Sequence, residues 1–593
     1  MNGVVAALNA CEGLHERGFT FVGAKGPGED LVVSFHQLRE LAQRRAAHYL
    51  SLGLRRGDRL ALVIPEGEHF IPAFLGALWI GLIPVPLYPP LSLGKLDAFM
   101  EALVTILNVA RPRALVTTER VGKVLWSAAG RIPSLEKVIT TEEMQTAEPP
   151  DALPAAADLA DGDIAFLQFT SGSTALPKGV IVTHGSLAAN CKAIVEDGLH
   201  ADPLRDVAVS WLPLYHDMGL IGLVLAPVLF GIPTVYIPTL SFIKNATSWL
   251  ETIHKYRGSM SFAPNFAYAL VTKRAKPEQI ARWDLSRMRV FGCGSEPINP
   301  ETMRKFVQTF APAGLKPEAL LPCYGMAEAT LAISFVGLDE PLRTDRIDAE
   351  RYHADKKAAP AADGALEVVN CGRTFPGHAL SIQDEDGRLL PDRHVGEICF
   401  RGPSVAAGYW ENPEATRAAG MGAPGGWLRT GDLGYLVDGE MHISGRLKDI
   451  LIINGRNYYP QRIEWLVDEI AGVRRGSAVV FTRPGAASEE LVVVAESREQ
   501  DAAALKAQVS ARVNEEFSLA VAEVVLLQPG ALPKTSSGKL QRRKTRDQYL
   551  TGALGKEGRG GNARLAVARH LALAWMGRAQ HRARVFFKRL GGA

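Results

Sequence analysis

Over its first 335 residues, this chain alternates short apolar runs of strand length with runs of helical periodicity. Strands separated by helices favour parallel sheets, because each crossover helix returns the chain to the same edge of the sheet. We therefore predict a multidomain α/β fold whose large N-terminal domain is built from layered α/β subdomains. The runs that carry this pattern are 60–64, 71–80, 114–117, 207–212, 234–238 and 290–292.

The chain has 593 residues, more than a single hydrophobic core usually serves, so we expect it to divide into domains. Over 337–369 the composition becomes charged and alanine-rich, which marks an excursion from the α/β pattern. From 370 to 446, short strands alternate with Gly, Pro and Asp-Gly turns, which indicates a small β-barrel or antiparallel sheet. We predict a large domain at 1–446, with 337–369 as a candidate insertion and 370–446 as its β-rich part, a small mobile α+β domain at 447–550, and a basic tail at 551–593.

Charge and composition argue against several kinds of partner and site. A net charge of +3 over the whole chain does not favour nucleic acid as a partner. The six cysteines are scattered without a CxxC or Cys/His cluster, which argues against a zinc site and favours a cytoplasmic protein with reduced thiols. The apolar run at 73–83 is too short to span a bilayer and is followed by four prolines, so we expect a buried helix and then a short strand.

A hydroxyl-rich turn within 167–186, LQFTSGSTALPKGVIVTHGS, is the first segment that indicates a ligand. Its hydroxyls and backbone N–H groups can surround phosphate oxygens, and a lysine adds positive charge. A Walker A loop is excluded, because Lys178 follows Pro177 and precedes Gly179. Considered alone, the segment is equally well explained as a polar surface turn. The candidate phosphate-binding residues are Thr170, Ser171, Gly172, Ser173, Thr174 and Lys178.

Together with four later segments, this turn resembles the adenylate-forming superfamily, which includes acyl-CoA synthetases, luciferases and the adenylation domains of peptide synthetases. Any single segment would be weak evidence. Five segments in the family's order, covering nearly all of the chain up to residue 550, are specific. The later four are SWLPLYHDMGLIG at 210–222, CYGMAEAT at 323–330, RTGDLGYL at 429–436 with GRLKDILIINGRNYYPQRIE at 445–464, and LPKTSSGKLQRRK at 532–544.

The resemblance implies that a carboxylate attacks the α-phosphorus of ATP and expels pyrophosphate. Such a site needs positive charge and hydrogen-bond donors where negative charge develops. By resemblance, Lys539 bridges the acyl carboxylate and the α-phosphate, His216 orients the substrate, and Lys178 helps to hold the leaving phosphates. Glu328 is the expected Mg²⁺ ligand, and Lys448 is the expected hinge of the small domain. The remaining nucleotide-binding candidates are Gly294, Ser295, Glu296, Gly325, Met326, Tyr324 for adenine, and Asp432 with Arg446 for ribose.

Within the superfamily, the chain is most similar to the fatty acyl-AMP ligases, through FLGALWIGLIPVPLYPP, GCGSEPI, PSVAAGYWENPEAT and GRNYYPQRIE. In those ligases, an insertion in the large domain is associated with restricted rotation of the small domain and with poor use of coenzyme A. The resemblance therefore implies a fatty acid substrate. It also implies acyl transfer to an acyl carrier protein, or to a carrier domain of a polyketide or peptide synthase. A fatty acyl-CoA synthetase is the alternative enzyme.

Two further features leave alternatives open. Most relatives have Gly where this chain has Ala175, and Gly usually supplies a positive φ or a close backbone approach. A third reading is therefore an impaired relative that binds nucleotide or acyl chains without full activity. In the tail, 562–590 contains seven Lys and Arg residues and no acidic residue, which fits a membrane-surface or partner-binding helix and fits a disordered basic segment equally well.

Overall fold

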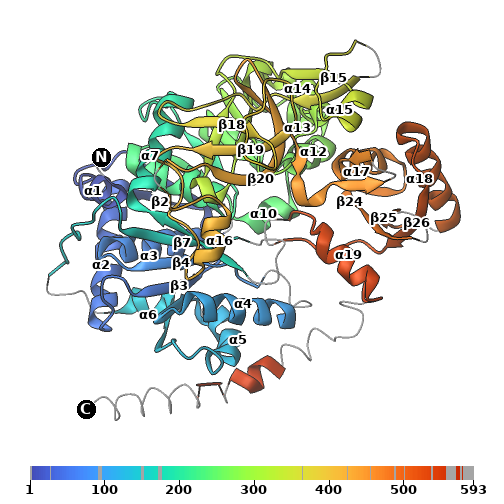
Figure 1. The fold of residues 1–593 in the computed structure, drawn as a ribbon. Helices are drawn as coiled ribbons and strands as arrows, with labels where there is room; N and C mark the ends of the chain where they lie inside the picture. Colours follow the sequence, from blue (N-terminus) through green and yellow to red (C-terminus); the bar gives the residue numbers. More distant parts are fainter. Residues whose placement is uncertain are drawn as a thin grey trace.

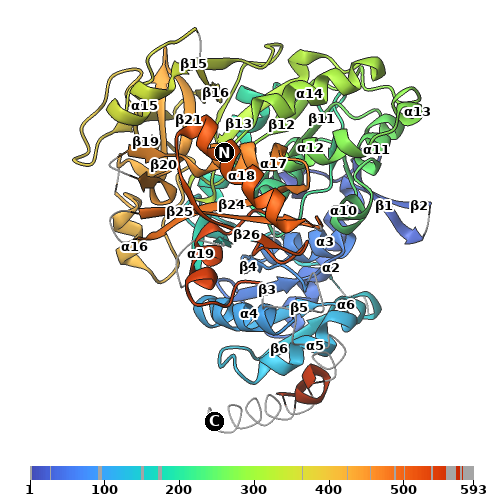
Figure 2. The ribbon, with the colours of Figure 1, turned by 90° about the vertical axis from the view of Figure 1, so that its right-hand side faces the viewer.

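The computed structural model describes residues 3–26, 28–90, 96–147, 152–170, 177–362, 365–423, 425–453, 456–485, 489–499, 501–535, 538–555, 569–574 and 577–578. The chain forms a large body and a smaller one that lies beside it (Figures 1 and 2). Both combine helices with sheets, so the predicted multidomain α/β class is confirmed. Among the described helices, none is long and apolar enough to cross a membrane.

The largest sheet has nine strands in the order β17-β14-β13-β12-β11-β9-β10-β1-β2. Its inner strands, from β13 to β1, run parallel, and the antiparallel strands lie at its two edges. In a parallel sheet, the loops that follow the strands all lie at the carboxyl ends of the strands. The strands are β1 (Gly18–Gly26), β2 (Glu29–Ser34), β9 (Ala208–Ser210), β10 (Thr234–Tyr236), β11 (Met260–Ala263), β12 (Val290–Cys293), β13 (Leu320–Gly325), β14 (Ala332–Phe335) and β17 (Arg373–Thr374).

A second, fully parallel sheet has the order β4-β3-β5-β6. Its first crossover helix, α3, is buried from Phe70 to Trp79 on all sides, as expected of a helix that is apolar all round. The expected buried helix and short strand are therefore confirmed as α3 and β4. The elements are β3 (Arg59–Val63), α3 (Gly67–Trp79), β4 (Ile83–Pro86), α4 (Leu96–Ala110), β5 (Ala114–Thr117), α5 (Glu119–Ala129), β6 (Lys137–Thr140) and α6 (Thr141–Thr146); α2 (Phe35–Ser51) precedes them.

An antiparallel hairpin carries the two ends of the predicted phosphate loop. It consists of β7 (Ile164–Thr170) and β8 (Lys178–Thr183), and Thr170 lies directly opposite Lys178. After β8, α7 (His184–Lys192) begins with a capping box in which Thr183 and Ser186 satisfy each other's backbone N–H groups. It continues into the π-helix η2 (Ala193–Gly198), and a second π-helix, η3 (Ile221–Leu225), lies between α8 (Asp217–Leu220) and α9 (Ala226–Phe230).

The β-rich part of the large body forms a four-stranded antiparallel sheet in the order β18-β19-β20-β21. We expected a small barrel or an antiparallel sheet here. Among the described residues, the outer strands β18 and β21 are not paired with each other, so the strands form an open antiparallel sheet. The candidate insertion forms a β-hairpin with a helix in its connection. These elements are β15 (Thr344–Asp348), α15 (Ala349–Asp355), β16 (Ala365–Val369), β18 (Ala379–Gln383), β19 (Gly396–Arg401), β20 (Leu428–Val437) and β21 (Glu440–Arg446).

The small body packs three helices against a three-stranded sheet, β24-β25-β26. It has a hydrophobic core of its own, to which Ile463, Val467, Val480, Val493 and Val509 contribute. Its elements are β22 (Leu451–Ile453), β23 (Arg456–Tyr458), α17 (Pro460–Glu469), β24 (Val473–Pro484), β25 (Glu489–Ser497), α18 (Ala502–Phe517), β26 (Val521–Leu527) and α19 (Arg542–Leu550).

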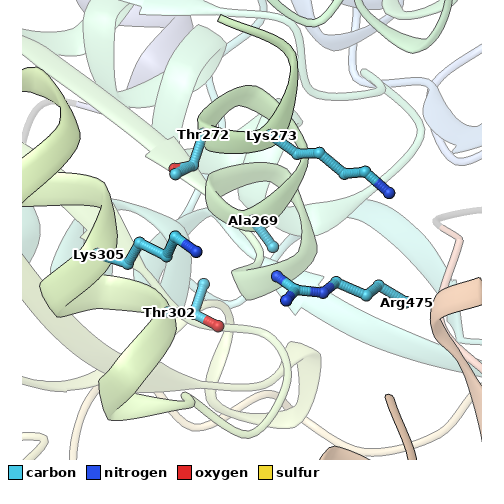
Figure 3. A pocket seen from close by; sticks show the side chains of 6 residues that line it. All are labelled: Ala269, Thr272, Lys273, Thr302, Lys305 and Arg475. Atoms are coloured by element: carbon cyan, nitrogen blue, oxygen red, sulfur yellow. The ribbon is translucent and has the colours of Figure 1, made fainter. Parts of the chain in front are cut away.

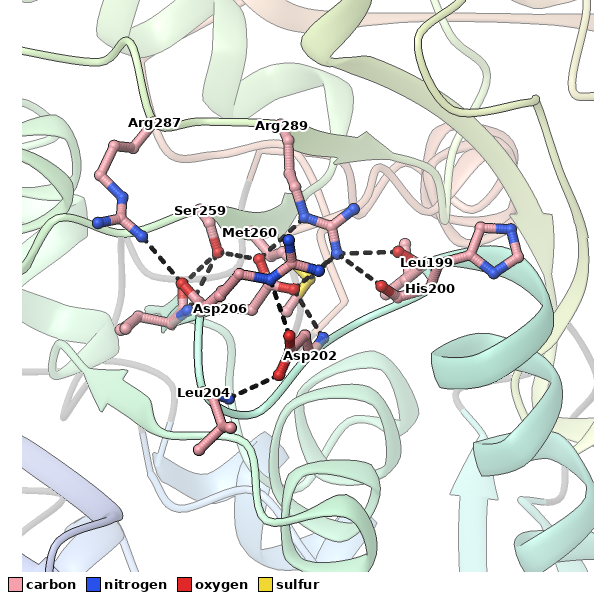
Figure 4. A network of polar contacts seen from close by, with 11 residues as sticks. Leu199, His200, Asp202, Leu204, Asp206, Ser259, Met260, Arg287 and Arg289 are labelled. Atoms are coloured by element: carbon pink, nitrogen blue, oxygen red, sulfur yellow. Dashed lines mark hydrogen bonds and ion pairs between the residues drawn. The ribbon is translucent and has the colours of Figure 1, made fainter.

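An ionic network connects the amino ends of three neighbouring strands of the large sheet (Figure 4). Asp206 precedes β9, Ser259 precedes β11 and Arg289 precedes β12. The Asp206 carboxylate accepts two hydrogen bonds from Arg289, from Nε at 2.9 Å and Nη2 at 2.7 Å, and one from the Ser259 hydroxyl at 2.8 Å. This network fixes the strand edge opposite to the one at which the candidate site forms.

Candidate active site

Four predicted site residues lie where parallel strands of the large sheet end or just beyond. His216 follows β9, Glu296 follows β12, and Tyr324 with Gly325 ends β13. The carboxyl edge of an open α/β sheet is the usual place for a ligand, because the loops there diverge and leave a crevice. The fold therefore brings three of the sequence motifs to one edge.

A buried carboxylate, Asp432 on β20, connects two of the predicted nucleotide-binding residues. Its Oδ2 accepts a hydrogen bond from the Tyr324 hydroxyl at 2.8 Å, and its Oδ1 accepts one from Nε of Arg446 at 3.1 Å. Burial raises the pKa of Asp432, an effect that Arg446 and the Tyr324 hydroxyl oppose. The Arg446 side chain is 61% exposed, so its outer nitrogens remain open to a ligand.

Tyr409 connects the predicted metal ligand with the predicted phosphate-binding lysine. Its hydroxyl donates to Oε1 of Glu328 at 2.8 Å. The ammonium of Lys178 lies 4.6 Å from the centroid of the same ring, within the range of a cation–π contact. Burial raises the pKa of Glu328, and the bond from Tyr409 acts in the opposite direction. Tyr409 is a site residue that our residue assignments missed, although it lies in the AAGYW segment.

His216 lies in close polar contact with its neighbour Asp217. Its Nδ1 lies 2.6 Å from Oδ1 of Asp217, which also accepts the backbone N–H of Met218 at 2.8 Å. Burial would raise the pKa of Asp217, but His216, Lys539 and the Met218 N–H together keep that pKa below its ordinary value. An ionised Asp217 holds the imidazole by its Nδ1 atom, which fixes the direction of the ring.

Lys539 lies on a tight loop of the small body that precedes α19. The backbone N–H of Lys539 donates to the Thr535 hydroxyl at 3.0 Å, and its carbonyl accepts the Thr535 N–H at 2.7 Å. A bridge between Lys534 and Leu540 and a bond from the Gln541 N–H to the Pro533 carbonyl close the loop. These contacts hold the backbone of Lys539 against Thr535.

The small body is oriented so that this loop meets the large one. Gly538 lies beside Phe266, with room for a Cβ at 3.9 Å from the ring, and the Phe266 N–H donates to Oε1 of Glu296 at 2.8 Å. Burial lowers the pKa of Lys539, whereas the carboxylates of Asp217 and Glu296, both on the large body, favour its charged form. Lys539 is thus within electrostatic reach of the loops after β9 and β12.

An apolar cavity extends from this edge into the large body. Its lining is mostly apolar with a few polar side chains, and it includes residues of both π-helices, which often occur at functional sites. Its lining residues include Asp217, Ser295, Tyr324, Ile194, Leu223, Phe262, Leu331 and Phe335.

Several predicted residues have structural reasons for their identity. A Cβ at Gly325 would lie 2.0 Å from the Leu331 carbonyl oxygen, and one at Gly294 would lie 2.8 Å from that of Cys323. The next residue, Met326, also contacts the Leu331 carbonyl, to which its backbone N–H donates at 2.8 Å. Ser295 has a φ of 69°, a strained value for a non-glycine residue and one that often accompanies function.

The predicted phosphate loop lies partly outside the described residues, and the predicted hinge residue lies between the two bodies. Ser171, Gly172, Ser173 and Thr174 lie outside the described residues, as does Ala175, so only Thr170 and Lys178 place the phosphate loop. Lys448 lies in the short turn Leu447–Asp449 between the two bodies, where it is exposed. Its function as a hinge remains a prediction.

Comparison with known proteins agrees with this geometry. Residues 17–410 match the AMP-binding enzyme family, and residues 448–558 match the family described as Disco-interacting protein 2-like, AMP domain. The first match covers more than half of the chain, which therefore belongs to the AMP-binding enzymes, an ATP-dependent adenylating family.

Individual relatives narrow the class. A putative acyl-CoA synthetase of Caulobacter vibrioides is 38% identical over 88% of this chain and 91% of its own length. The medium-chain-fatty-acid–[acyl-carrier-protein] ligase JamA of Moorena producens is 35% identical over 88% of this chain and 90% of its own. A solved structure from studies of fatty acyl-adenylate ligases of E. coli and L. pneumophila has 35% identity and a TM-score of 0.87, covering 93% of this chain and 98% of the other. The expected resemblance to fatty acyl-AMP ligases is confirmed.

Proposed function

We propose that this enzyme activates a fatty acid with ATP to form a fatty acyl-adenylate, and then transfers the acyl group to the phosphopantetheine thiol of an acyl carrier protein or carrier domain. The observation that carries the proposal is the position of Lys539. Its neighbour Gly538 lies beside Phe266 of the large body, and the carboxylates of Asp217 and Glu296 are close enough to favour the charged form of Lys539. Relatives that are named as fatty acyl-adenylate and acyl-carrier-protein ligases support the same reaction class.

In the first step, a carboxylate oxygen of the acid forms a bond to the α-phosphorus, and the bond from that phosphorus to the pyrophosphate oxygen breaks. Lys539 neutralises the two anions that must approach each other. Lys178 and Thr170 hold the leaving phosphates, and their opposite places on β7 and β8 support this role. Positioned charges of this kind act mainly where charge develops in the transition state.

The nucleoside is assigned to the Asp432 cluster. The ring of Tyr324 lines the cavity and offers an apolar face for adenine. Asp432 is already held by Tyr324 and Arg446, so its carboxylate is preorganised to accept hydrogen bonds from ribose hydroxyls. Arg446 is exposed enough to reach the same sugar.

Glu328 is the residue assigned to Mg²⁺. A magnesium ion in such enzymes needs one or two carboxylates, with phosphate oxygens and waters completing its octahedron. Glu328 fits this requirement, because it is a carboxylate fixed through Oε1 by Tyr409 and lies near the phosphate-binding Lys178. The ion, when bound, would neutralise charge on the phosphates.

The apolar cavity supports a fatty acid as the substrate. Asp217 and Ser295 line it together with the apolar side chains of Leu223, Phe262 and Phe335, against which an alkyl group would be shielded from water. His216 contacts Asp217, one of the lining residues, and is assigned to orient the carboxylate of the substrate. A chain without charges along its length fits this wall best.

The candidate insertion supports a carrier protein as the acceptor. On α15, Tyr352 lies 5.3 Å from Tyr459, and His353 lies 5.5 Å from Tyr458, measured between ring centroids. Both tyrosines belong to the first segment of the small body. Contacts of this kind connect the insertion to the part that has to rotate, which agrees with restricted rotation and poor use of coenzyme A.

Exchange of labelled pyrophosphate into ATP, dependent on a fatty acid, tests the activation step. We expect Lys539→Ala to reduce the exchange rate by about 100-fold or more, since it removes the charge that compensates the developing transition state. Lys506→Ala, an exposed lysine on α18, is the matched control and should leave the rate unchanged. Equal exchange by wild type and Lys539→Ala would reject the assigned role.

Product analysis tests the acceptor. Purified enzyme with ATP and a panel of fatty acids receives either coenzyme A or a phosphopantetheinylated carrier. We expect acylated carrier as the main product. Abundant acyl-CoA would instead establish the acyl-CoA synthetase that the Caulobacter relative's name indicates. Absence of exchange with every acid would favour the impaired relative.

A further inference from the structure

A second cleft, separate from the cavity already described, opens between the two bodies (Figure 3). Its volume is about 300 Å³, and it is lined by α12 (Asn265–Arg274) and α14 (Pro300–Phe310) of the large body and by the start of β24. The lining residues are Ala269, Thr272, Lys273, Thr302, Lys305 and Arg475.

Three of these side chains are cations that come from both bodies. Lys305 and Arg475 extend toward each other across the opening, with the Thr302 hydroxyl beside them, while the ammonium of Lys273 lies at the rim (Figure 3). Among the described residues, no ion pair connects any of the three to a carboxylate. Glu301 precedes Lys305 by one helical turn, but its carboxylate pairs with Arg304. The cleft is therefore positive on both walls.

Arg475 is directed into the cleft by a β-bulge. The register between β24 and β25 shifts between Val473 and Ala478, and Gly476 in the bulge has a φ of 65°. Bulges of this kind often redirect a side chain near a functional site. The Asp468 carboxylate holds the bulge by accepting the N–H groups of Gly476 at 2.9 Å and Ser477 at 3.3 Å.

The same bulge supports the loop of the catalytic lysine. Lys534, five residues before Lys539, donates from Nζ to the Gly476 carbonyl at 3.2 Å and to the Ser477 hydroxyl at 3.3 Å. On the large body, α12 starts at Asn265 and meets that loop through Phe266 and Gly538. Lys273 lies seven residues further along α12, about 10 Å along the helix axis. The bulge at Gly476 and helix α12 therefore both contact the Lys539 loop, and both also contribute to the cleft.

We propose that this cleft binds a phosphate-type anion, which joins Lys305 to Arg475 and thereby holds the small body in the orientation that presents Lys539 to the large body. Without an anion, like charges face each other across the interface and disfavour this orientation. Phosphate groups are well matched to an arginine and a lysine that converge from two sides. Pyrophosphate is the anion that the reaction itself releases, and this source alone rests on the proposed function. Inorganic phosphate shares the same chemistry.

The distance between the two bodies tests the proposal without any turnover. Glu278→Cys on the large body and Glu515→Cys on α18 provide two exposed positions for spin labels, and all six native cysteines are buried. We expect pyrophosphate, added at constant ionic strength, to narrow the distance distribution to a single closed orientation. Arg475→Gln and Lys305→Gln should each raise the concentration needed at least about tenfold. Lys506→Gln, which removes one exposed charge from the same body, should not.

The controls separate this site from the active site and from general screening. Lys539→Ala should keep the response to pyrophosphate, because the anion contacts Arg475 and Lys305. Inorganic phosphate acting at higher concentration would indicate that pyrophosphate is the preferred ligand, and equal midpoints would indicate a general phosphate site. A wild-type midpoint in both Arg475→Gln and Lys305→Gln, or an equal response to chloride, would overturn the proposal. If pyrophosphate narrows the distance distribution but no fatty acid supports exchange of pyrophosphate into ATP, the anion site is supported and the adenylating function is rejected.

Discussion

At the scale of single residues, Tyr409 connects two groups that the sequence places 150 residues apart, Lys178 and Glu328. A phenol suits this position because its hydroxyl can donate to a carboxylate while its ring face attracts an ammonium. The hydroxyl keeps Glu328 in one orientation, and the ring keeps Lys178 near the same point. Tyr409 therefore positions the assigned metal ligand relative to the assigned phosphate ligand.

Tyr409→Phe removes the hydroxyl that donates to Glu328 and keeps the ring that contacts Lys178. We expect pyrophosphate exchange to fall about tenfold, because a hydrogen bond to a charged group contributes about 1.5–3 kcal/mol. The Mg²⁺ concentration for half-maximal exchange should rise, since Glu328 is no longer held. Tyr256→Phe also removes a hydroxyl bonded to a carboxylate, that of Asp30, and serves as the control. An unchanged Mg²⁺ dependence in Tyr409→Phe would rule out the positioning role.

At the scale of elements, the amino ends and the carboxyl ends of the parallel strands in the large sheet have different functions. The loops after β9, β12 and β13 carry the site, and the residues before β9, β11 and β12 carry the ionic network of Asp206 and Arg289 (Figure 4). Because the strands are short, contacts that fix their amino ends also limit how far their carboxyl ends can move. The network stabilises the fold without contacting the site.

Asp206→Asn should lower the free energy of unfolding by about 3 kcal/mol, because it leaves the partly buried Arg289 guanidinium without its countercharge. Asp202→Asn is the matched control in the same network: Asp202 pairs with the exposed Arg205, and such pairs contribute about 0–1 kcal/mol. Denaturant unfolding of both variants measures the difference. Equal losses in the two variants would show that burial of the pair is not the cause.

At the scale of the whole molecule, the chain returns to its own N-terminal region after the small body. His570 contacts Asp97 at 2.6 Å and Ser127 at 2.9 Å, and the guanidinium of Arg578 lies over the ring of Trp126. These contacts place residues 569–574 and 577–578 against α4 and α5. The same short stretch leaves Leu571 and Leu573 exposed.

Truncation after Gly555 tests whether the basic tail also binds membranes. We expect binding to vesicles that contain phosphatidylserine to weaken at least tenfold, because each basic residue near an anionic surface contributes about 1 kcal/mol. Pyrophosphate exchange should change less than about twofold, since the site is built from residues before 540. Cosedimentation with vesicles measures binding, and equal binding by both forms would exclude a membrane role for the tail.

The sequence by itself determined the alternation that builds two parallel sheets, because strand and helix periodicities are local properties. It also determined the family, through five ordered motifs, and with it the chemical character of Lys539, Glu328 and Asp432. The Gly residues at 294 and 325 were predicted for their motifs, whereas their packing against Cys323 and Leu331 follows from the fold.

Only the tertiary structure decided which of these groups meet. Tyr409 was not assigned to the site, since an aromatic residue considered alone is usually part of a core. The cleft between Lys305 and Arg475 depends on how the two bodies lie against each other, which local sequence does not encode. The tail was predicted as a basic segment, and its contact with Asp97 and Trp126 arises from packing across nearly the whole length of the chain. Long-range contacts of this kind come from burial and charge that many distant residues share, so no local pattern specifies them.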